Sequence, residues 1–465
     1  MCLSLQVPLR LLNTWLQSYK LLTMKSLRKV CLGLSGLSLI LLLAGLIAGQ
    51  QSIWKPAAVA LSVFFAIGIG AIKALQGYQY TAWIITAVVA GMVYPAAFLR
   101  WGDFDLRNKW LILLVVQMVM FGMGIQMSLD DFTNLGSTKK GIIIGLLCHF
   151  SIMPLVGFLL TRIFHFDTEI AAGIILIGSC SSGLASNVMV YIARANLVLS
   201  VTVTAMSTLA APIMTPFLMK LFAGTLINIH FIDMMMEIIK IVIVPIGAAL
   251  LHDYLKRATP QGRRNVKLVA LASVIWLAAL PFGLWQLLQA NLSAELLQTG
   301  EVLGFFAGAV IVGYCYHFFA TRYVKLDSLM PYVSMFGIIY FTTVTTAAGR
   351  ENLMKVGLLL FLVSVFHNAA GYFFGYWLSR AFKLDKNSAR SIAFEVGLQN
   401  GGMASGLAGS MGKLGTVGLA AAVFSPWMNI SGSILANYWR RRPVDDVKVE
   451  EDKRVAEVDK LMVNT

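Results

Sequence analysis

Apolar runs long enough to cross a bilayer, about 20 residues each, alternate with short polar stretches along the chain. This pattern predicts about fourteen membrane-spanning helices. The first set lies near residues 31–49, 55–75, 81–99, 110–128, 141–163, 169–193 and 196–223. The second set lies near residues 233–254, 267–289, 302–321, 329–348, 353–379, 389–411 and 414–438. We therefore expect an all-α, polytopic membrane protein.

The composition agrees with this reading of the pattern. Of 465 residues, 58% are hydrophobic and 13% are charged, whereas soluble proteins are about 45–50% apolar and about 25% charged. Soluble enzymes, nucleic-acid binders and secreted disulfide scaffolds are thereby excluded. The five cysteines show no CxxC spacing, so we interpret them as small core residues rather than as disulfide or metal-binding pairs.

The net charge of +15 is explained by the membrane, because Lys and Arg gather on cytoplasmic loops. With both termini inside, about 23 basic residues lie on the inner side and about 9 on the outer side. No nucleic-acid partner is expected. We predict a multi-pass protein of the cell inner (plasma) membrane, with residues 1–30 and the charged tail 440–465 in the cytoplasm.

The two sets of spans have a similar order of features. Each begins with plain apolar helices and ends with segments rich in Gly, Ser, Asn and Pro. We therefore divide the chain into repeats at 31–224 and 225–439, and an odd number of spans in each would place them in opposite orientations. Inverted repeats are typical of secondary transporters, which hold their substrate near the midplane.

Two segments interrupt the apolar pattern, at residues 178–216 and 394–412. Both place Gly beside polar residues at membrane depth, and broken helix is tolerated there only where it is buried in protein or lines a cavity. Both include the sixth span of their repeat. Interruptions at corresponding positions of two repeats indicate a transport site.

Glu395 is the sharpest single candidate, because a carboxylate at the bilayer midplane costs about 2.5–3.5 kcal/mol unless a cation or proton neutralises it. Oxygen ligands suit a hard cation such as Na⁺. The oxygen-bearing candidates in the two interrupted segments are Glu395, Gln399, Ser186, Asn187, Ser200 and Thr204. For each Ser, Thr or Asn the alternative is an ordinary interhelical hydrogen bond, worth about 0.6 kcal/mol.

Several separated motifs make the resemblance to a known family specific. They include ASN at 185–187, LSVTVT at 199–204, STLAAPIMTP at 207–216, EVGLQNGG at 395–402 and FSPWMNISGSILANYW at 424–439. In these motifs and their order the chain resembles the bile acid:sodium symporter family over about 81–254 and 329–442. The resemblance implies a ten-helix inverted-repeat fold with a panel domain, a core domain and two broken helices that cross.

The resemblance also implies the binding residues. One Na⁺ site would use Ser186, Asn187, Ser200, Thr204 and Glu395. A second would use Glu395, Gln399, backbone oxygens near Val396 and Leu398, and His149, which stands where the family has a glutamine. An organic anion would bind at the crossing, near Gly183, Leu184, Ala185, Asn187, Asn400 and Asn429, because helix N-termini attract anions.

The chain departs from the family at Ser181-Ser182-Gly183, Leu184, His149 and Met428-Asn429, and in having four more helices. The extra helices are either one pair inserted in each repeat, or an N-terminal addition at 31–75 with one inserted pair. They would enlarge the panel or form a dimer interface, so a monomer and a homodimer both stay open.

We expect a sodium-coupled symporter of an organic anion (a bile acid-like molecule, a sterol conjugate or a small carboxylate) that works by alternating access without a cofactor. The first alternative is proton coupling through His149 and Glu395, since an imidazole titrates near neutral pH. For His149 itself, a core histidine hydrogen-bonded to backbone stays equally open. The second is a membrane ligand sensor that does not transport. An enzyme is not expected, because no HExxH or Ser/His/Asp pattern is present.

Overall fold

The computed structural model describes residues 6–133 and 139–444. The chain divides into two compact units, with the boundary between Phe98 and Leu99. The predicted tail at 440–465 lies outside the described residues from 445 onward.

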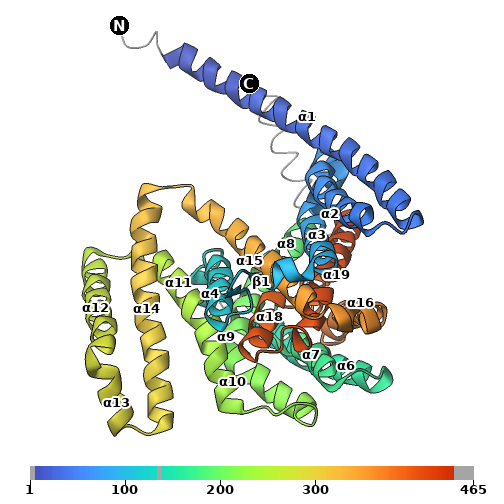
Figure 1. The fold of residues 1–465 in the computed structure, drawn as a ribbon. Coiled ribbons are helices and arrows are strands. Elements are labelled where there is room, and N and C mark those ends of the chain that lie inside the picture. The colour runs from blue at the N-terminus through green and yellow to red at the C-terminus, as the bar shows by residue number, and fades with distance from the viewer. Residues whose placement is uncertain (1–5, 134–138, 445–465) are drawn as a thin grey trace. The chain divides into compact units, whose positions relative to one another are not determined.

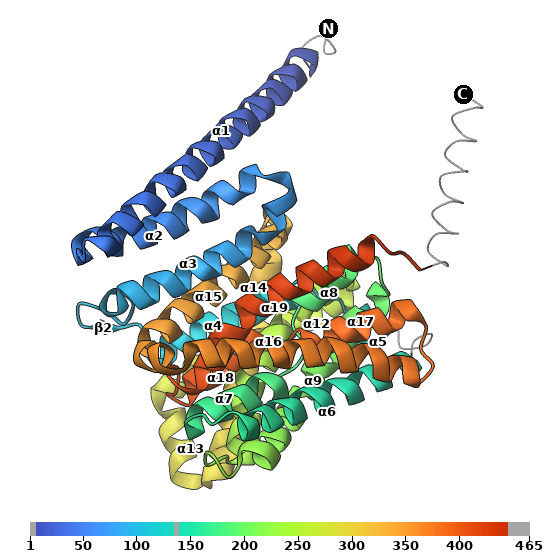
Figure 2. The same cartoon turned by 90° about the vertical axis from the view of Figure 1, so that its right-hand side faces the viewer.

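The first unit is a helical hairpin followed by a shorter helix. Its helices are α1 (Gln6–Ile47), α2 (Gln51–Gly68), η1 (Ile69–Ala71), η2 (Lys73–Tyr78), α3 (Gln79–Val93) and η3 (Pro95–Phe98). Helices α1 and α2 run side by side (Figure 2). Gly49 makes the turn between them with a positive φ of 66°, which favours glycine. At Gly68 a Cβ would lie 2.7 Å from the backbone nitrogen of Leu32, so glycine permits the close approach.

The second unit begins with a small hairpin of β1 (Arg100–Trp101) and β2 (Phe104–Asp105). Its first helices are α4 (Lys109–Gly124), α5 (Asp130–Thr133), α6 (Lys139–Ile163), α7 (Thr168–Ser179), α8 (Ala185–Ile192), α9 (Leu197–Ala223), α10 (Phe231–Ile238) and α11 (Val244–Arg257). The remaining helices are α12 (Pro260–Ala279), α13 (Trp285–Asn291), α14 (Ala294–Arg322), α15 (Leu326–Ala348), α16 (Arg350–Ala381), α17 (Lys386–Gly397), α18 (Gly401–Ser410) and α19 (Val417–Arg440). Single π-helical turns, η4 (Ile239–Ile243) and η5 (Leu280–Leu284), join α10 to α11 and α12 to α13.

The hairpin before α4 was not expected from the sequence. Its turn places Gly102 at a φ of 61°, and Arg100 pairs with Asp105 in an antiparallel register. The Arg107 guanidinium donates to Asp105 at 2.8 and 3.0 Å. These hydrogen bonds to the ionised form lower the pKa of Asp105 to about 2.

Each predicted span corresponds to one helix or to consecutive helices joined at a break or an irregular turn. Among the described residues, ten helices are long and apolar enough to cross a membrane, and α4 and α7 are shorter apolar helices. The prediction of an all-α, polytopic membrane protein is confirmed. The number of spans and the inverted repeats stay predictions. The first predicted span starts at 31, whereas α1 begins at Gln6 and its apolar segment is Ser26–Ile47.

Two sets of helices position the candidate site in the second unit. We call α6–α9 and α16–α19 the core helices; α6 packs on α7, α9 and α16, and α19 packs on α7, α8 and α18. We call α4, α11 and α15 the panel helices, because α4 packs against both of the others. Helices α12 and α14 lie outside α11 (Figure 1). Both sets of core helices have the same order, with a long helix, a broken pair and another long helix.

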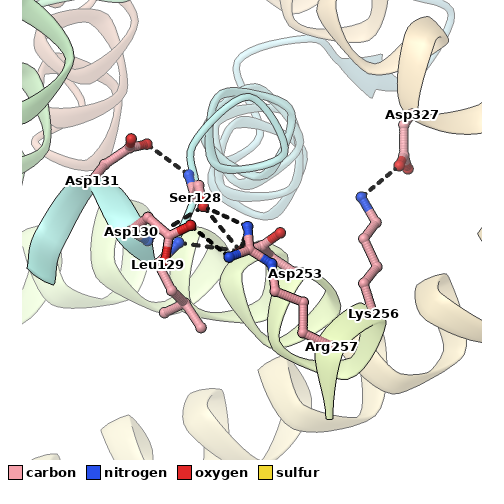
Figure 3. A network of polar contacts seen from close by, with 8 residues as sticks. All are labelled: Ser128, Leu129, Asp130, Asp131, Asp253, Lys256, Arg257 and Asp327. Atoms are coloured by element: carbon pink, nitrogen blue, oxygen red, sulfur yellow. Dashed lines mark hydrogen bonds and ion pairs between the residues drawn. The ribbon is translucent and has the colours of Figure 1, made fainter. Parts of the chain in front are cut away.

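A polar network fastens one end of the panel helices (Figure 3). Arg257 at the end of α11 donates to Asp130 at 2.5 Å and to Ser128 at 3.0 Å. Asp253 accepts the backbone N–H of Leu129 at 3.1 Å, so the segment after α4 is held on α11. These bonds fix the ends of α4 and α11 together.

Candidate functional site

The two broken helices meet at their breaks. Chain segments between α7 and α8 and between α17 and α18 form an antiparallel bridge at Ser182 and Gln399. The Gly183 N–H donates to the Leu398 carbonyl at 3.1 Å, and the Asn400 N–H donates to the Ser181 carbonyl at 2.9 Å. Backbone groups that the breaks release are thus satisfied by the other broken helix, which buried backbone requires. The predicted crossing of two broken helices is confirmed.

Glycine at position 183 makes this approach possible. A Cβ there would lie 2.8 Å from the Gln399 carbonyl oxygen, closer than ordinary van der Waals contact. The small residues in the GSCSSG stretch therefore allow two backbones to pair where any larger side chain would separate them.

A cluster of hydroxyls surrounds the Glu395 carboxylate, which is fully buried on α17. Ser186 on α8 donates to Oε1 at 2.6 Å, and Ser200 on α9 donates to the same oxygen at 2.5 Å. Thr204 donates to Oε2 at 2.8 Å. Ser200 and Thr204 lie one turn apart on α9, so both face α17.

Asn187 extends this cluster toward the surface. Its Oδ1 lies 2.8 Å from Ser200 Oγ and 3.3 Å from Thr204 Oγ1, and the residue is partly exposed. All the residues expected for the first Na⁺ site, from α8, α9 and α17, therefore come together around one carboxylate. Within the described part of the chain no Lys or Arg forms an ion pair with Glu395.

A second group of oxygens lies at the break between α17 and α18. The Gln399 amide donates to the Val396 carbonyl at 2.7 Å. Its other atom, Oε1, is buried and has no hydrogen-bond partner among the described residues. The Leu398 carbonyl accepts from Gly183 N–H and, at 3.3 Å, from Ser182 Oγ. An unpaired buried acceptor is costly unless a donor or a cation completes it.

His149 lies beside this group but faces backbone, not the carboxylate. Its Nδ1 is 2.9 Å from the Glu395 carbonyl oxygen, and its Nε2 is 2.9 Å from the Cys180 carbonyl oxygen. The fully buried ring on α6 thus connects both breaks. His149 therefore lies close to Glu395, but it contacts the main chain of Glu395 and not its carboxylate.

The residues expected to bind the substrate differ in their burial and in their hydrogen bonds. Leu184 and Ala185, at the start of α8, are partly exposed, whereas Gly183 is buried. Asn400 is buried and its Oδ1 caps α18 by accepting the Met403 N–H at 3.0 Å. Asn429 donates to the Ser425 carbonyl at 2.8 Å on its own helix α19. Gly183, Leu184, Ala185, Asn187 and Asn400 thus lie at or next to the two breaks, and Asn429 lies on α19.

Two polar contacts at the crossing were missed from the sequence. Ser182 is buried and its Oγ lies 3.3 Å from Ser186 Oγ, which makes it part of the hydroxyl cluster. Asn368 on α16 donates to the Gly397 carbonyl at 2.8 Å and accepts from Ser431 at 2.6 Å. The GSCSSG stretch signalled Ser182, whereas an Asn within the long apolar helix α16 gave no specific signal.

Comparisons with known proteins bear on the family of the chain. The profile of the Sodium Bile acid symporter family matches residues 112–292. The uncharacterized sodium-dependent transporter YocS of Bacillus subtilis is 32% identical over 80% of this chain and 94% of its own length. The chain belongs to the sodium bile acid symporter family. The predicted family is therefore confirmed, and the protein is a sodium-coupled membrane transporter rather than an enzyme.

More distant family members match as well. The probable sodium/metabolite cotransporter BASS1 of Oryza sativa is 27% identical over 79% of this chain and 73% of its own length. Sodium/bile acid cotransporter 4 of Mus musculus is 25% identical over 60% of this chain and 51% of its own length. Among solved structures, the sodium proton antiporter MjNhaP1 of Methanocaldococcus jannaschii gives a TM-score of 0.41 at 13% identity, over 88% of this chain and 98% of that chain. A likeness at that level says nothing about the site.

Proposed function

We propose that this family member carries an organic anion into the cell together with Na⁺, by alternating access of the core helices against the panel helices. The observation that carries the proposal is the buried Glu395 carboxylate, held by three hydroxyls and by no basic side chain among the described residues. A bound Na⁺ would neutralise a charge that otherwise costs about 2.5–3.5 kcal/mol at membrane depth.

The first Na⁺ would be held by Ser186, Asn187, Ser200, Thr204 and Glu395. The donor set fits a hard cation, since every side-chain atom in it that faces the carboxylate is an oxygen. The ion would link α8 and α9 to α17, so its binding would order the crossing at which the substrate is expected. Coupling would follow from this shared set of helices.

A second cation position is supported by the unpaired Oε1 of Gln399 and the neighbouring carbonyls of Val396 and Leu398. His149 occupies the side of this group nearest α6 and bonds the Glu395 carbonyl. We therefore assign His149 to the second site as a residue that holds the main chain of Glu395 in place beside it.

The substrate is proposed to be a carboxylate or another organic anion. Helices α8 and α18 both begin at the crossing, and a helix N-terminus carries positive partial charge that attracts anions. Leu184, Ala185 and Asn187 are the partly exposed residues there, so they would meet the anion first. Gly183 and Asn400 would shape the backbone behind it, and Asn429 would line the α19 side.

The decisive experiment is uptake by the full chain reconstituted in liposomes. A mixture of labelled organic anions is offered under an inward Na⁺ gradient, an inward proton gradient, or neither. Sodium symport predicts uptake only with the Na⁺ gradient, and Glu395→Ala should abolish it. Uptake driven by the pH gradient alone would instead support proton coupling through His149 and Glu395. Binding of an anion with no uptake under any gradient would support a sensor.

We also place the protein in the plasma membrane with both termini cytoplasmic, on the distribution of Lys and Arg. Reporter fusions at each end, active only on one side of the membrane, would test this orientation. The molecular mass of the protein, measured in detergent, would distinguish a monomer from a homodimer.

A further inference from the structure

A long apolar cavity lies away from the crossing, between the panel helices and the hairpin of α12, α13 and α14. Its volume is about 680 Å³, within the range of about 300–1,000 Å³ that small-molecule sites occupy. Leu114 and Phe121 of α4, Ala248 of α11, Leu277 of α12 and Val312 of α14 are among the side chains that line it. Helices α12 and α14 are mostly exposed, so this cavity lies on the outside of the core.

Three glycines at successive turns form one wall of the cavity. Gly300, Gly304 and Gly308 lie on one face of α14, and a Cβ at Gly300 or Gly308 would meet no atom within 4 Å. At Gly304 the nearest atom would be Leu277 Cδ2 at 3.9 Å. Such a stripe normally lets another helix pack closely, but here it faces open space. From Gly300 to Val312 the wall is about 18 Å long at 1.5 Å per residue.

Charged side chains gather at one end of this wall. Lys240 is buried in the π-helical turn η4, and its Nζ lies 3.1 Å from both Glu237 and Glu301. A smaller polar cavity of about 220 Å³ adjoins there; Glu301 and Phe305 line both cavities, and Lys109 lines the smaller one. Lys240 thus forms ion pairs with both carboxylates, so this group of three side chains has one excess negative charge. Lys109 is a separate positive charge beside it.

The π-helical turn η4 indicates that this end of the cavity has a functional role in addition to packing. Its irregular backbone exposes the Lys240 carbonyl, which accepts from the Gln117 amide of α4 at 3.1 Å. Single π-helical turns within α-helices frequently occur at functional sites. Trp110 and Trp285 line the same cavity, and tryptophan is typical of the membrane–water interface.

We propose that this cavity binds a phospholipid with a primary-amine headgroup, with its ammonium at Glu301, its phosphate at Lys109 and one acyl chain along the glycine stripe of α14. The charge pattern fits a zwitterion, since an acidic excess lies beside a separate base. The length and apolar lining fit a chain. The site is separate from the Na⁺ cluster and does not depend on the transported substrate.

The test measures lipid retained by the detergent-purified full chain by native mass spectrometry. Phosphatidylethanolamine, phosphatidylcholine and phosphatidylglycerol with the same acyl chains are added at equal concentration. We expect phosphatidylethanolamine to be retained about threefold or more over each of the others, the size of a charge-pair preference. Phosphatidylcholine lacks ammonium N–H groups, and phosphatidylglycerol lacks the ammonium. Equal retention of all three lipids would overturn the proposal.

Two variants locate the lipid. Gly304→Leu should fill the groove and reduce retention of every lipid. Ala307→Leu introduces the same side chain on the same helix outside the cavity lining and should not reduce retention. Glu301→Gln should keep lipid bound but remove the preference for phosphatidylethanolamine. A thermal shift with Na⁺ confirms that each variant is folded. Unchanged lipid retention in both test variants, or a change only in oligomeric state with Gly304→Leu, would contradict the assignment.

Discussion

At the residue scale, the central feature is a carboxylate whose neighbours are all hydrogen-bond donors without charge. Ser186, Ser200 and Thr204 can orient Glu395 and partly compensate its lost hydration. Three hydroxyls supply no net charge, so the ionised carboxylate is complete only when a cation joins the cluster. The same geometry that makes the empty site costly therefore makes Na⁺ binding favourable.

Replacing Glu395 with Gln should distinguish the destabilising effect of the buried charge from its role in Na⁺ binding. Without Na⁺, Glu395→Gln should be at least as stable as the natural chain, because it removes a buried charge that costs about 2.5–3.5 kcal/mol. With Na⁺, only the natural chain should gain stability. Melting temperatures measured across a NaCl series, with choline chloride at equal ionic strength, check this. Ser379→Ala is the matched control, since this buried hydroxyl bonds within α16, away from the cluster. An equal Na⁺ response in Glu395→Gln would contradict the first site.

His149 should matter for both stability and ion binding. In His149→Ala the ring N–H, which donates to the carbonyl of either Glu395 or Cys180, is lost, and an unsatisfied buried group costs about 1–3 kcal/mol. We expect lower thermal stability together with weaker Na⁺ binding. His367→Ala is the comparison, because that buried ring contacts the Met153 carbonyl on α6 instead. It should lose stability without a change in Na⁺ affinity, and a loss of affinity in both variants would argue for a general structural effect.

At the element scale, the sequence predicted where the helices break but not how the breaks pair. The segments 178–216 and 394–412 were predicted to be interrupted because they place Gly beside polar residues at membrane depth. Irregular backbone there leaves hydrogen-bonding groups that lipid cannot satisfy. Pairing of Ser182 with Gln399 depends on contacts between residues far apart in sequence, which no local pattern contains. The η4 turn around Lys240 was likewise invisible, because its residues also fit an ordinary helix.

The candidate site was predictable to a similar extent. Residues of the first cluster came from motif resemblance and from the charge of Glu395, and the structure places them together. The orientation of His149 toward two carbonyls was not predictable, since ring direction depends on how α6 packs on both breaks. Ser182 was missed because a hydroxyl beside a helix break bonds locally as often as it binds a ligand.

Gly183 is the position where the crossing should be most sensitive. Gly183→Ala would place a Cβ about 2.8 Å from the Gln399 carbonyl, so the two backbones must separate. Overpacking of this kind costs about 1–3 kcal/mol, and we expect most Na⁺-driven uptake to be lost. Gly247→Ala on α11 is the control, because a Cβ there meets no atom within 4 Å. Thermal stability and liposome uptake measured on both variants check the prediction, and normal uptake by Gly183→Ala would show that the crossing tolerates separation.

At the scale of the whole molecule, the packing of α18 on α4 is one of the contacts between the core helices and the panel helices, and its α18 face is smooth. Gly402, Gly406 and Gly409 of α18 present a face of small residues to α4. A Cβ at Gly402 would lie 3.3 Å from Val119, and one at Gly409 would lie 2.7 Å from Ile112. A helix with no protruding side chains on this face can slide or separate without unlocking interdigitated ridges.

Alternating access predicts that this contact must open during each transport cycle. In a background without the free cysteines, Val116→Cys combined with Gly406→Cys should form a disulfide under oxidation, since Val116 contacts that face of α18. Oxidation should stop uptake, and reduction should restore it. The control joins two core helices, with Gly145→Cys on α6 and Val203→Cys on α9, where a Cβ at Gly145 would lie 2.9 Å from Val203. These helices would move together, so uptake should continue when this pair is cross-linked. Continued transport with the disulfide formed between positions 116 and 406 would show that the core helices do not move against the panel helices at this contact. Alternating access would then require movement at a different contact.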